Sequence, residues 1–224
     1  MNNFKIFVNI NIKLQKADIF INRDSNTEPA FSRILYLDNL IQLSSFEIFL
    51  KKTILETEKI LNISFEKLYL MVEDARLNSI DISFKENFEN KPIAKTTIEY
   101  LLQDLRQQFL DNHNDKIIAH MVIKKCKLDG EEYSNIPFEK KCKNFILEIS
   151  FIYLKKNLVS NLQELFKKYQ IEIDKIICTN YAKSLLNIEV DDLSKAGIAV
   201  IAGNNLNEVN IVSKKTNKLG FFEK

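Results

Sequence analysis

The sequence contains few glycines, prolines and cysteines, and no tryptophan. Its 224 residues include four glycines, three prolines and three cysteines. The cysteines, Cys126, Cys142 and Cys178, are odd in number and far apart and form no CxxC pair, so their spacing indicates neither a disulfide framework nor a zinc site. Such cysteine usage fits a protein of the reducing cytosol.

Long apolar runs and an excess of one charge are also missing. No stretch approaches the roughly 18 apolar residues of a membrane span, and residues 1–6 lack the apolar core and the cleavage site of a signal peptide. Because 32 basic and 30 acidic residues leave a net charge of +2, electrostatics give no reason to expect nucleic-acid binding. We therefore expect a cytoplasmic protein without direct membrane insertion and without a nucleic-acid partner.

The hydrophobic pattern of the first part of the chain is typical of an α/β fold. Alternating apolar residues predict strands, and apolar residues at helical spacing after Ser44 or Ser45, either of which can cap a helix, predict a helix. The predicted elements are strands at 4–12, 17–21 and 34–37, a helix at 44–62 and a strand at 67–72. Three strands, a crossover helix and a further strand make an α/β opening.

The middle of the chain follows a different order, of strand, helix, strand and strand. The helix is predicted at 93–110, and its apolar stripe indicates core packing. The strands are predicted at 79–84, 117–124 and 145–154, with a turn at Asp129-Gly130. The α/β pattern then resumes with a helix at 158–169, a strand at 175–178, a helix at 181–186 and a hairpin at 197–212. We therefore predict a discontinuous domain of residues 1–77 and 156–224, interrupted by a module at 78–155.

This order of elements resembles the N-terminal half of the bacterial cell division protein FtsA. Three stretches carry the resemblance: 63–70, which leads into the inserted module, 133–137, before its last strand, and 158–177, a helix followed by a strand. The resemblance implies an α/β (α+β) chain that forms half of an actin-like, ribonuclease H-like ATPase fold, interrupted by the FtsA-type strand-helix-strand-strand insertion.

The resemblance also places two turns where family members bind the phosphates of ATP. The first, acidic-Ile-Gly-Thr in type, corresponds to 9–12, and the second, Asp-Ile-Gly-Gly-Gly-Thr, to 202–206. The positions of this sequence at which the family's phosphate-binding turns are eroded are Asn9, Asn11, Ala202, Gly203, Asn204 and Asn205. Glycine lets backbone amides approach phosphate, and acidic side chains hold Mg²⁺. We therefore expect no cofactor, no metal site and no ATP binding.

Other catalytic chemistry finds no support in the sequence. His113 and His120 are the only histidines, at a predicted helix end and strand start, where surface or packing roles are expected. The adjacent carboxylates at 131–132 and 191–192 are expected in solvated loops. GxSxG, P-loop and HExxH patterns are absent. We therefore predict that the protein is not an enzyme.

The resemblance implies a non-catalytic scaffold or adaptor in the assembly of the division machinery. In FtsA the inserted module binds other division proteins, so partners of the FtsN type or full-length FtsA-like proteins are expected here. The FtsZ-binding surface of the family lies in its second half, so FtsZ is not an expected partner. A location on the inner face of the membrane at the division site would depend on such a partner.

Three other interpretations are open at this point. The chain is a PilM-like scaffold for pilus or secretion assembly, one half of a split actin-like ATPase that still binds nucleotide, or a decaying gene product. Against decay, the helix predicted at 158–169 keeps Leu158, Leu162, Leu165 and Phe166 on one face. The sequence identifies neither the partner nor the oligomeric state.

Overall fold

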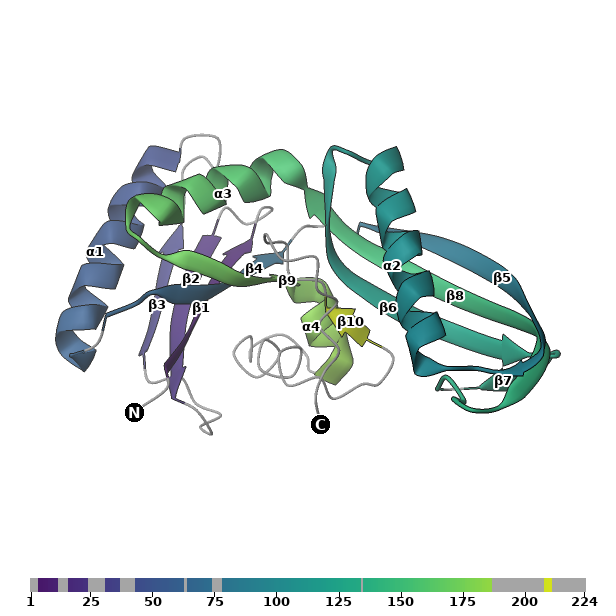
Figure 1. Cartoon of the computed structure of the whole chain (residues 1–224). Coiled ribbons are helices and arrows are strands. Elements are labelled where there is room, and N and C mark those ends of the chain that lie inside the picture. Colours follow the sequence, from purple (N-terminus) through teal and green to yellow (C-terminus); the bar gives the residue numbers. More distant parts are fainter. Residues whose placement is uncertain are drawn as a thin grey trace. The chain divides into compact units, whose positions relative to one another are not determined.

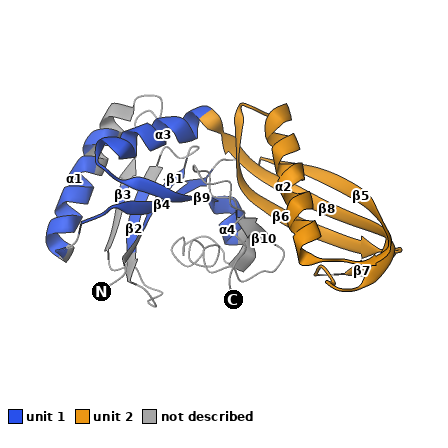
Figure 2. Ribbon diagram, viewed as in Figure 1, with its two compact units in different colours: residues 1–77, 157–202 blue, residues 78–156, 203–224 orange. Residues whose placement is uncertain are grey.

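The computed structural model describes residues 4–11, 16–23, 31–36, 43–62, 64–73, 78–133, 135–186 and 208–210. The chain divides into two compact units (Figure 2), unit 1 with residues 1–77 and 157–202 and unit 2 with residues 78–156 and 203–224. Both combine helices with a β-sheet, so the predicted α/β class is confirmed. No helix in these ranges is long and apolar enough to cross a membrane.

Unit 1 is built on a five-stranded mixed sheet (Figure 1). Its strands, in the order β3-β2-β1-β4-β9, are β3 (Phe31–Tyr36), β2 (Lys16–Arg23), β1 (Phe4–Asn11), β4 (Lys67–Glu73) and β9 (Glu172–Cys178). The first three strands form an antiparallel meander, whereas β1, β4 and β9 run parallel. Parallel strands need long connections: β1 reaches β4 through β2, β3 and a helix, and β4 reaches β9 through unit 2 and a further helix.

Strand β1 of unit 1 is buried on both faces. In β1, Ile6, Phe7, Val8 and Ile10 are all at most 6% exposed, as expected for a central strand covered on each side. Helix α1 (Leu43–Leu61) covers the face that carries Ile6 and Val8. On the opposite face, the Phe7 ring packs against Phe20 and Tyr69. Residues at odd positions of β1, including Asn9, therefore lie on the face away from α1.

Two further helices belong to unit 1. Helix α3 (Lys156–Lys168) buries Val159, Leu162, Leu165 and Phe166, so Val159 occupies the core position that we predicted for the partly exposed Leu158. Its last residue, Lys168, pairs with Glu47 of α1 at 3.2 Å. Helix α4 (Thr179–Leu186) begins directly after β9. These contacts tie the later part of the chain to the opening sheet.

Unit 2 is an antiparallel sheet with one long helix across a face (Figure 1). Its strands, in the order β10-β6-β8-β5, are β10 (Glu208–Asn210), β6 (Lys116–Leu128), β8 (Lys141–Lys155) and β5 (Ser79–Pro92), and β7 (Glu131–Tyr133) pairs with β6. Helix α2 (Lys95–Asn112) buries Ile98, Leu102, Leu105 and Phe109 against the sheet. The Phe109 and Phe151 rings stack at 4.7 Å.

The strands of unit 2 extend beyond the predicted ones, and β7 was not predicted. Strand β5 continues to Pro92, and β8 begins at Lys141, through polar residues with little apolar alternation. Pairing with β8 holds β5 up to Asn87 and again at Lys91 and Pro92, with a register shift between them, because the backbone supplies the hydrogen bonds whatever the side chain. Strand β10 pairs with β6 in unit 2, whereas the prediction assigned these residues to the first domain.

Candidate functional site

The carboxyl ends of the parallel strands β1, β4 and β9 meet at one edge of the unit 1 sheet. In register, Asn11 of β1 lies beside Glu73 of β4, and Val72 of β4 lies beside Cys178 of β9. Ligand sites in open α/β sheets characteristically lie outside such carboxyl ends. Asn9 and Asn11, two of the predicted phosphate-loop positions, lie at this edge and are 1% and 8% exposed.

Asn9 is held by side chains from two other elements. Asp18 of β2 stands directly opposite in the antiparallel register, and the Asn9 Nδ2 atom donates to Asp18 Oδ2 at 3.3 Å. Thr179, the first residue of α4, donates its hydroxyl to Asn9 Oδ1 at 2.8 Å. All three side chains are buried, Asn9 at 1%, Asp18 at 6% and Thr179 at 0% exposure. The amide is thus satisfied at both ends within the protein.

A second polar contact lies further out at the same edge. Glu73, the last residue of β4, accepts a hydrogen bond from Lys183 of α4, with Nζ and Oε1 2.8 Å apart. The two side chains are 20% and 25% exposed, so the pair is partly shielded from solvent. The Glu73 carboxylate therefore has its positive partner within unit 1.

Metal chemistry has no evident ligand set here. In the ranges that the structure describes, no three His, Cys, Asp or Glu side chains are grouped so as to hold an ion. The Asp18 carboxylate accepts from Asn9, and the Glu73 carboxylate pairs with Lys183. Magnesium in nucleotide sites needs accessible carboxylate or water ligands, and the contacts at this edge are internal.

Sequence reasoning found only part of this cluster. Asn9 and Asn11 were predicted positions, but Asp18, Thr179 and the Glu73–Lys183 pair were not. A charged residue inside the apolar run 17–21 was the available signal for Asp18, because the antiparallel register of β1 and β2 places it opposite Asn9. The second predicted turn, with Ala202, Gly203, Asn204 and Asn205, lies outside the described residues.

The other polar residues singled out in the sequence lie elsewhere. His120 is fully buried in β6, and the His113 ring packs against Phe109 at the end of α2. Glu131 and Glu132 form part of β7, so the prediction of a loop there is wrong. Pairing with Leu128 and Lys127 of β6 holds them in an extended conformation. The carboxylates at 191–192 lie outside the described residues.

The cysteines are buried free thiols. Burial raises the pKa of the Cys126 thiol to about 11, and burial also raises the pKa of the Cys142 thiol. Thiols with raised pKa values are protonated at neutral pH and are poor nucleophiles and metal ligands. Cys126 and Cys142 therefore serve as small core residues.

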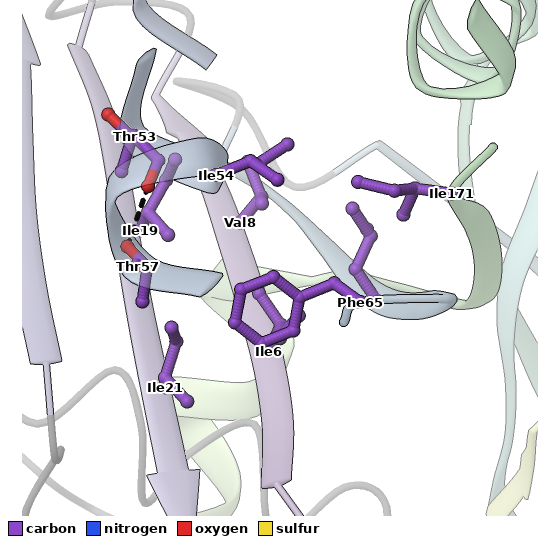
Figure 3. Close-up of a pocket in the computed structure, with 10 residues that line it drawn as sticks. Ile6, Val8, Ile19, Ile21, Thr53, Ile54, Thr57, Phe65 and Ile171 are labelled. Carbon is purple, nitrogen blue, oxygen red and sulfur yellow. Dashed lines mark hydrogen bonds between the residues drawn. The ribbon is translucent and has the colours of Figure 1, made fainter. Parts of the chain in front are cut away.

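A small cavity lies between α1 and the unit 1 sheet (Figure 3). Its walls are mostly apolar, and the only polar side chains are Thr53 and Thr57 of α1. Thr57 donates its hydroxyl to the Thr53 carbonyl at 2.6 Å, whereas the Thr53 hydroxyl has no hydrogen-bond partner among the residues that the structure describes. Ligand pockets combine apolar walls with several convergent polar groups, and this cavity lacks them.

Comparisons with known proteins give structural matches only. No protein-family model and no curated protein matches the chain. Among solved structures, a PilM-PilN type IV pilus biogenesis complex is 6% identical, with a TM-score of 0.48 and coverage of 83% of this chain and 49% of that chain. The cytoplasmic domain of EpsL, an inner membrane component of the type II secretion system of Vibrio cholerae, is 10% identical, with a TM-score of 0.39 and coverages of 80% and 57%.

A third structure is a protein of unknown function from Bacteroides thetaiotaomicron VPI-5482, which is described as having an actin-like ATPase fold. It is 14% identical, with a TM-score of 0.35 and coverage of 82% of this chain and 55% of that chain. The chain thus spans about half the length of each of these structures. None of the three descriptions refers to cell division.

Proposed function

We propose that this protein is a non-catalytic adaptor on half of an actin-like fold, and that it binds other proteins and not ATP. The observation that carries the proposal is the buried Asn9 amide, which is hydrogen-bonded to Asp18 on one side and to Thr179 on the other. In the resemblance to FtsA, this is a position at which a phosphate-binding turn has a carboxylate. An amide without charge and without accessible atoms supports neither Mg²⁺ nor phosphate binding.

The electrostatics of the edge support the same proposal. A phosphate group needs donors or cations that are open to it, and Lys183 at this edge already pairs with Glu73. Binding ATP here would require breaking that pair or the Asn9 contacts. Each broken buried hydrogen bond costs about 1–3 kcal/mol when a partner is left unsatisfied. Polar groups at this edge therefore act mainly to join β1, β2, β4 and α4.

For the cellular setting we propose pilus or secretion-system assembly. The structures named above, a PilM-PilN complex and EpsL, come from such systems, and an adaptor would hold protein partners together without chemistry. The protein would then be cytoplasmic and reach the inner face of the membrane through a partner.

A division adaptor of the FtsA type is the second candidate. The observation in its favour is the order of β5, α2, β6 and β8 in unit 2, which matches the strand-helix-strand-strand module expected from the resemblance, with the short β7 added. In this case unit 2 would bind other division proteins, including FtsN-like or full-length FtsA-like partners.

The absence of ATP binding is tested by calorimetric titration of the full chain with Mg²⁺-ATP. We expect no binding heat at millimolar nucleotide, and no shift in the thermal unfolding midpoint, since a ligand that binds the folded state stabilises it. Micromolar binding would overturn the non-catalytic proposal and favour one half of a split ATPase.

The proposed cellular setting is tested by a pull-down from the cytosol of the source cells, with the full chain as bait. Captured proteins are identified by mass spectrometry and then purified, and their affinity for the full chain is measured. Direct binding of a pilus or secretion component supports the first setting, and direct binding of a division protein supports the second. If no captured protein binds directly, the adaptor proposal is wrong.

A further inference from the structure

Strand β5 forms an edge of the unit 2 sheet. In the order β10-β6-β8-β5, it pairs only with β8 among the described strands, and Figure 1 shows it at the margin of the sheet. An edge strand presents a row of backbone N–H and C=O groups to which another strand can add. The question is which strand would fit.

The backbone directions along β5 follow from one hydrogen bond. The Tyr153 N–H donates to the Asn78 carbonyl at 3.0 Å, which makes residues 78 and 153 a hydrogen-bonded pair. In an antiparallel ladder such pairs alternate, so Ile80, Ile82 and Phe84 also direct their backbone groups toward β8. The backbone groups of the odd-numbered residues from Ser79 to Asn87 therefore point away from the sheet.

The regular part of this edge has clear ends. Pairing with β8 is regular from Ser79 to Asn87, and it then shifts before Lys91. Glu89 and Asn90 in the shifted segment have φ values of 50° and 64°, which bend the strand out of regular geometry. The regular edge therefore spans 79–87, and Ser83 is its central residue.

We propose that two copies of this chain pair antiparallel through β5, about a twofold axis at Ser83. In this register Asp81 lies opposite the partner's Lys85, and Ile82 lies opposite the partner's Phe84, each pair occurring twice by symmetry. The register uses the whole regular edge and pairs outward-facing backbone groups with one another.

Charge pairing distinguishes this register from the alternative registers of the same two strands. A register shifted by two residues in either direction also pairs outward-facing backbone groups, but it places Asp81 opposite the partner's Ser83 or the partner's Asn87, and neither pairing joins opposite charges. Opposite charges and apolar pairs directly across a sheet are favourable. Lys85 is exposed, and the structure gives it no ion-pair partner within the described ranges.

Asp81 is suited to such a pair. Its Oδ2 atom accepts from Lys124 of β6 at 2.7 Å, and its side chain is 61% exposed. This hydrogen bond holds the pKa of Asp81 below its ordinary value, so the carboxylate is ionised at neutral pH. A carboxylate accepts several hydrogen bonds, so Lys124 and the partner's Lys85 can share it.

Cysteine cross-linking of the full chain tests the register. With Ser83→Cys, the two cysteines on the axis would have Cα atoms about 5.5 Å apart, within the range of a disulfide. The matched control is Lys85→Cys, whose two copies would lie more than about 13 Å apart along the strand. The native cysteines are buried, so each variant has one accessible thiol. We expect mild oxidation to link Ser83→Cys and not Lys85→Cys.

Sedimentation of the variants tests the charge pairing. We expect a concentration-dependent dimer that Lys85→Asp weakens about tenfold or more, because both charge pairs become repulsive, and that Asp81→Lys with Lys85→Asp restores. Thermal unfolding verifies that each variant is folded. A chain that stays monomeric at high concentration, or equal cross-linking of the two cysteine variants, would overturn the proposal. Either result would leave the adaptor function untouched, since that rests on Asn9.

Discussion

At the scale of single residues, the Asn9 amide occupies a predicted phosphate-loop position and makes its hydrogen bonds within the protein. Its side chain joins β1 to β2 through Asp18 and to α4 through Thr179. An amide can donate and accept at once, so it satisfies both neighbours, which a carboxylate cannot do. The same position therefore acts structurally when it is asparagine and would carry charge when it is aspartate.

Asn9→Asp is expected to destabilise the protein by about 3 kcal/mol, because it places a second buried carboxylate against Asp18. Like charge and burial would raise the pKa of the new carboxyl, so the loss should be smallest below pH 4 and grow as the pH rises. Urea unfolding across pH measures this. Asn9→Asp with Asp18→Asn restores a donor and an acceptor and should recover most of the loss; equal loss in both variants would contradict the pairing.

Replacing Thr53 with valine is expected to stabilise the protein. The Thr53 hydroxyl is buried in the cavity of Figure 3 without a partner among the described residues, so Thr53→Val removes an unsatisfied polar group at nearly constant shape and should stabilise the protein by about 1 kcal/mol. Thr57→Val is the control, since it also removes a hydrogen bond to the Thr53 carbonyl and should gain less. Thermal unfolding compares them, and a loss with Thr53→Val would indicate a water bound to that hydroxyl.

At the scale of elements, the turn between β6 and β7 shows how residue type sets strand pairing. Asp129 and Gly130 both have positive φ, at 49° and 94°, which aspartate and glycine tolerate better than most residues. Two-residue hairpin turns need this conformation. The Asp129 carboxylate also accepts from the backbone N–H groups of Lys143 and Asn144, which fixes the turn to β8.

These backbone hydrogen bonds hold the pKa of Asp129 below its ordinary value of 3.8. The stabilisation is therefore present above the unfolded pKa and is lost as the pH falls through the lower folded pKa. Asp129→Asn is expected to lower stability at pH 7, with the difference from the native chain narrowing below pH 4. Chemical unfolding at several pH values measures it. Asp111→Asn, at an exposed carboxylate that contacts Gln107, is the control and should show no comparable change.

At the scale of the whole molecule, unit 2 has a hydrophobic core of its own. The buried core of unit 2 includes one cluster drawn from residues 88 to 151, and α2, the sheet strands and Ile93 between β5 and α2 supply it. A unit with its own core can fold by itself. Unit 1 instead needs residues from both ends of the chain, since β4 pairs with β9 across the length of unit 2.

A fragment of residues 78–156 is expected to fold and to unfold cooperatively in urea. Phe109→Ala in this fragment should cost about 3–5 kcal/mol, because the ring stacks on Phe151 inside the cluster. Tyr100→Ala, at a ring that is 72% exposed on the same helix, is the matched control and should change little. A fragment without a cooperative transition, or equal effects of the two substitutions, would show that the core depends on unit 1.

The order of helices and strands was largely predictable, because each depends on local periodicity. The apolar stripe of α2 and the apolar alternation of β1 each depend on residues that are close together in the sequence. The predicted strand at 79–84 stopped short of Pro92, because the rest of β5 lacks apolar alternation and depends on its pairing with β8, which is regular to Asn87 and resumes at Lys91. Predicting where a strand ends therefore required knowing the strand with which it pairs.

The sequence by itself determined the α/β class, the position of Asn9 at the end of the first strand, and the absence of a charge there. Only the tertiary structure decided what that amide does, since Asp18 and Thr179 reach it through strand register and through a helix 170 residues away. It also decided that β5 is an edge, because strand order depends on pairing between distant segments. Local patterns fix conformation along the chain, whereas sites and surfaces depend on which distant residues the fold brings together.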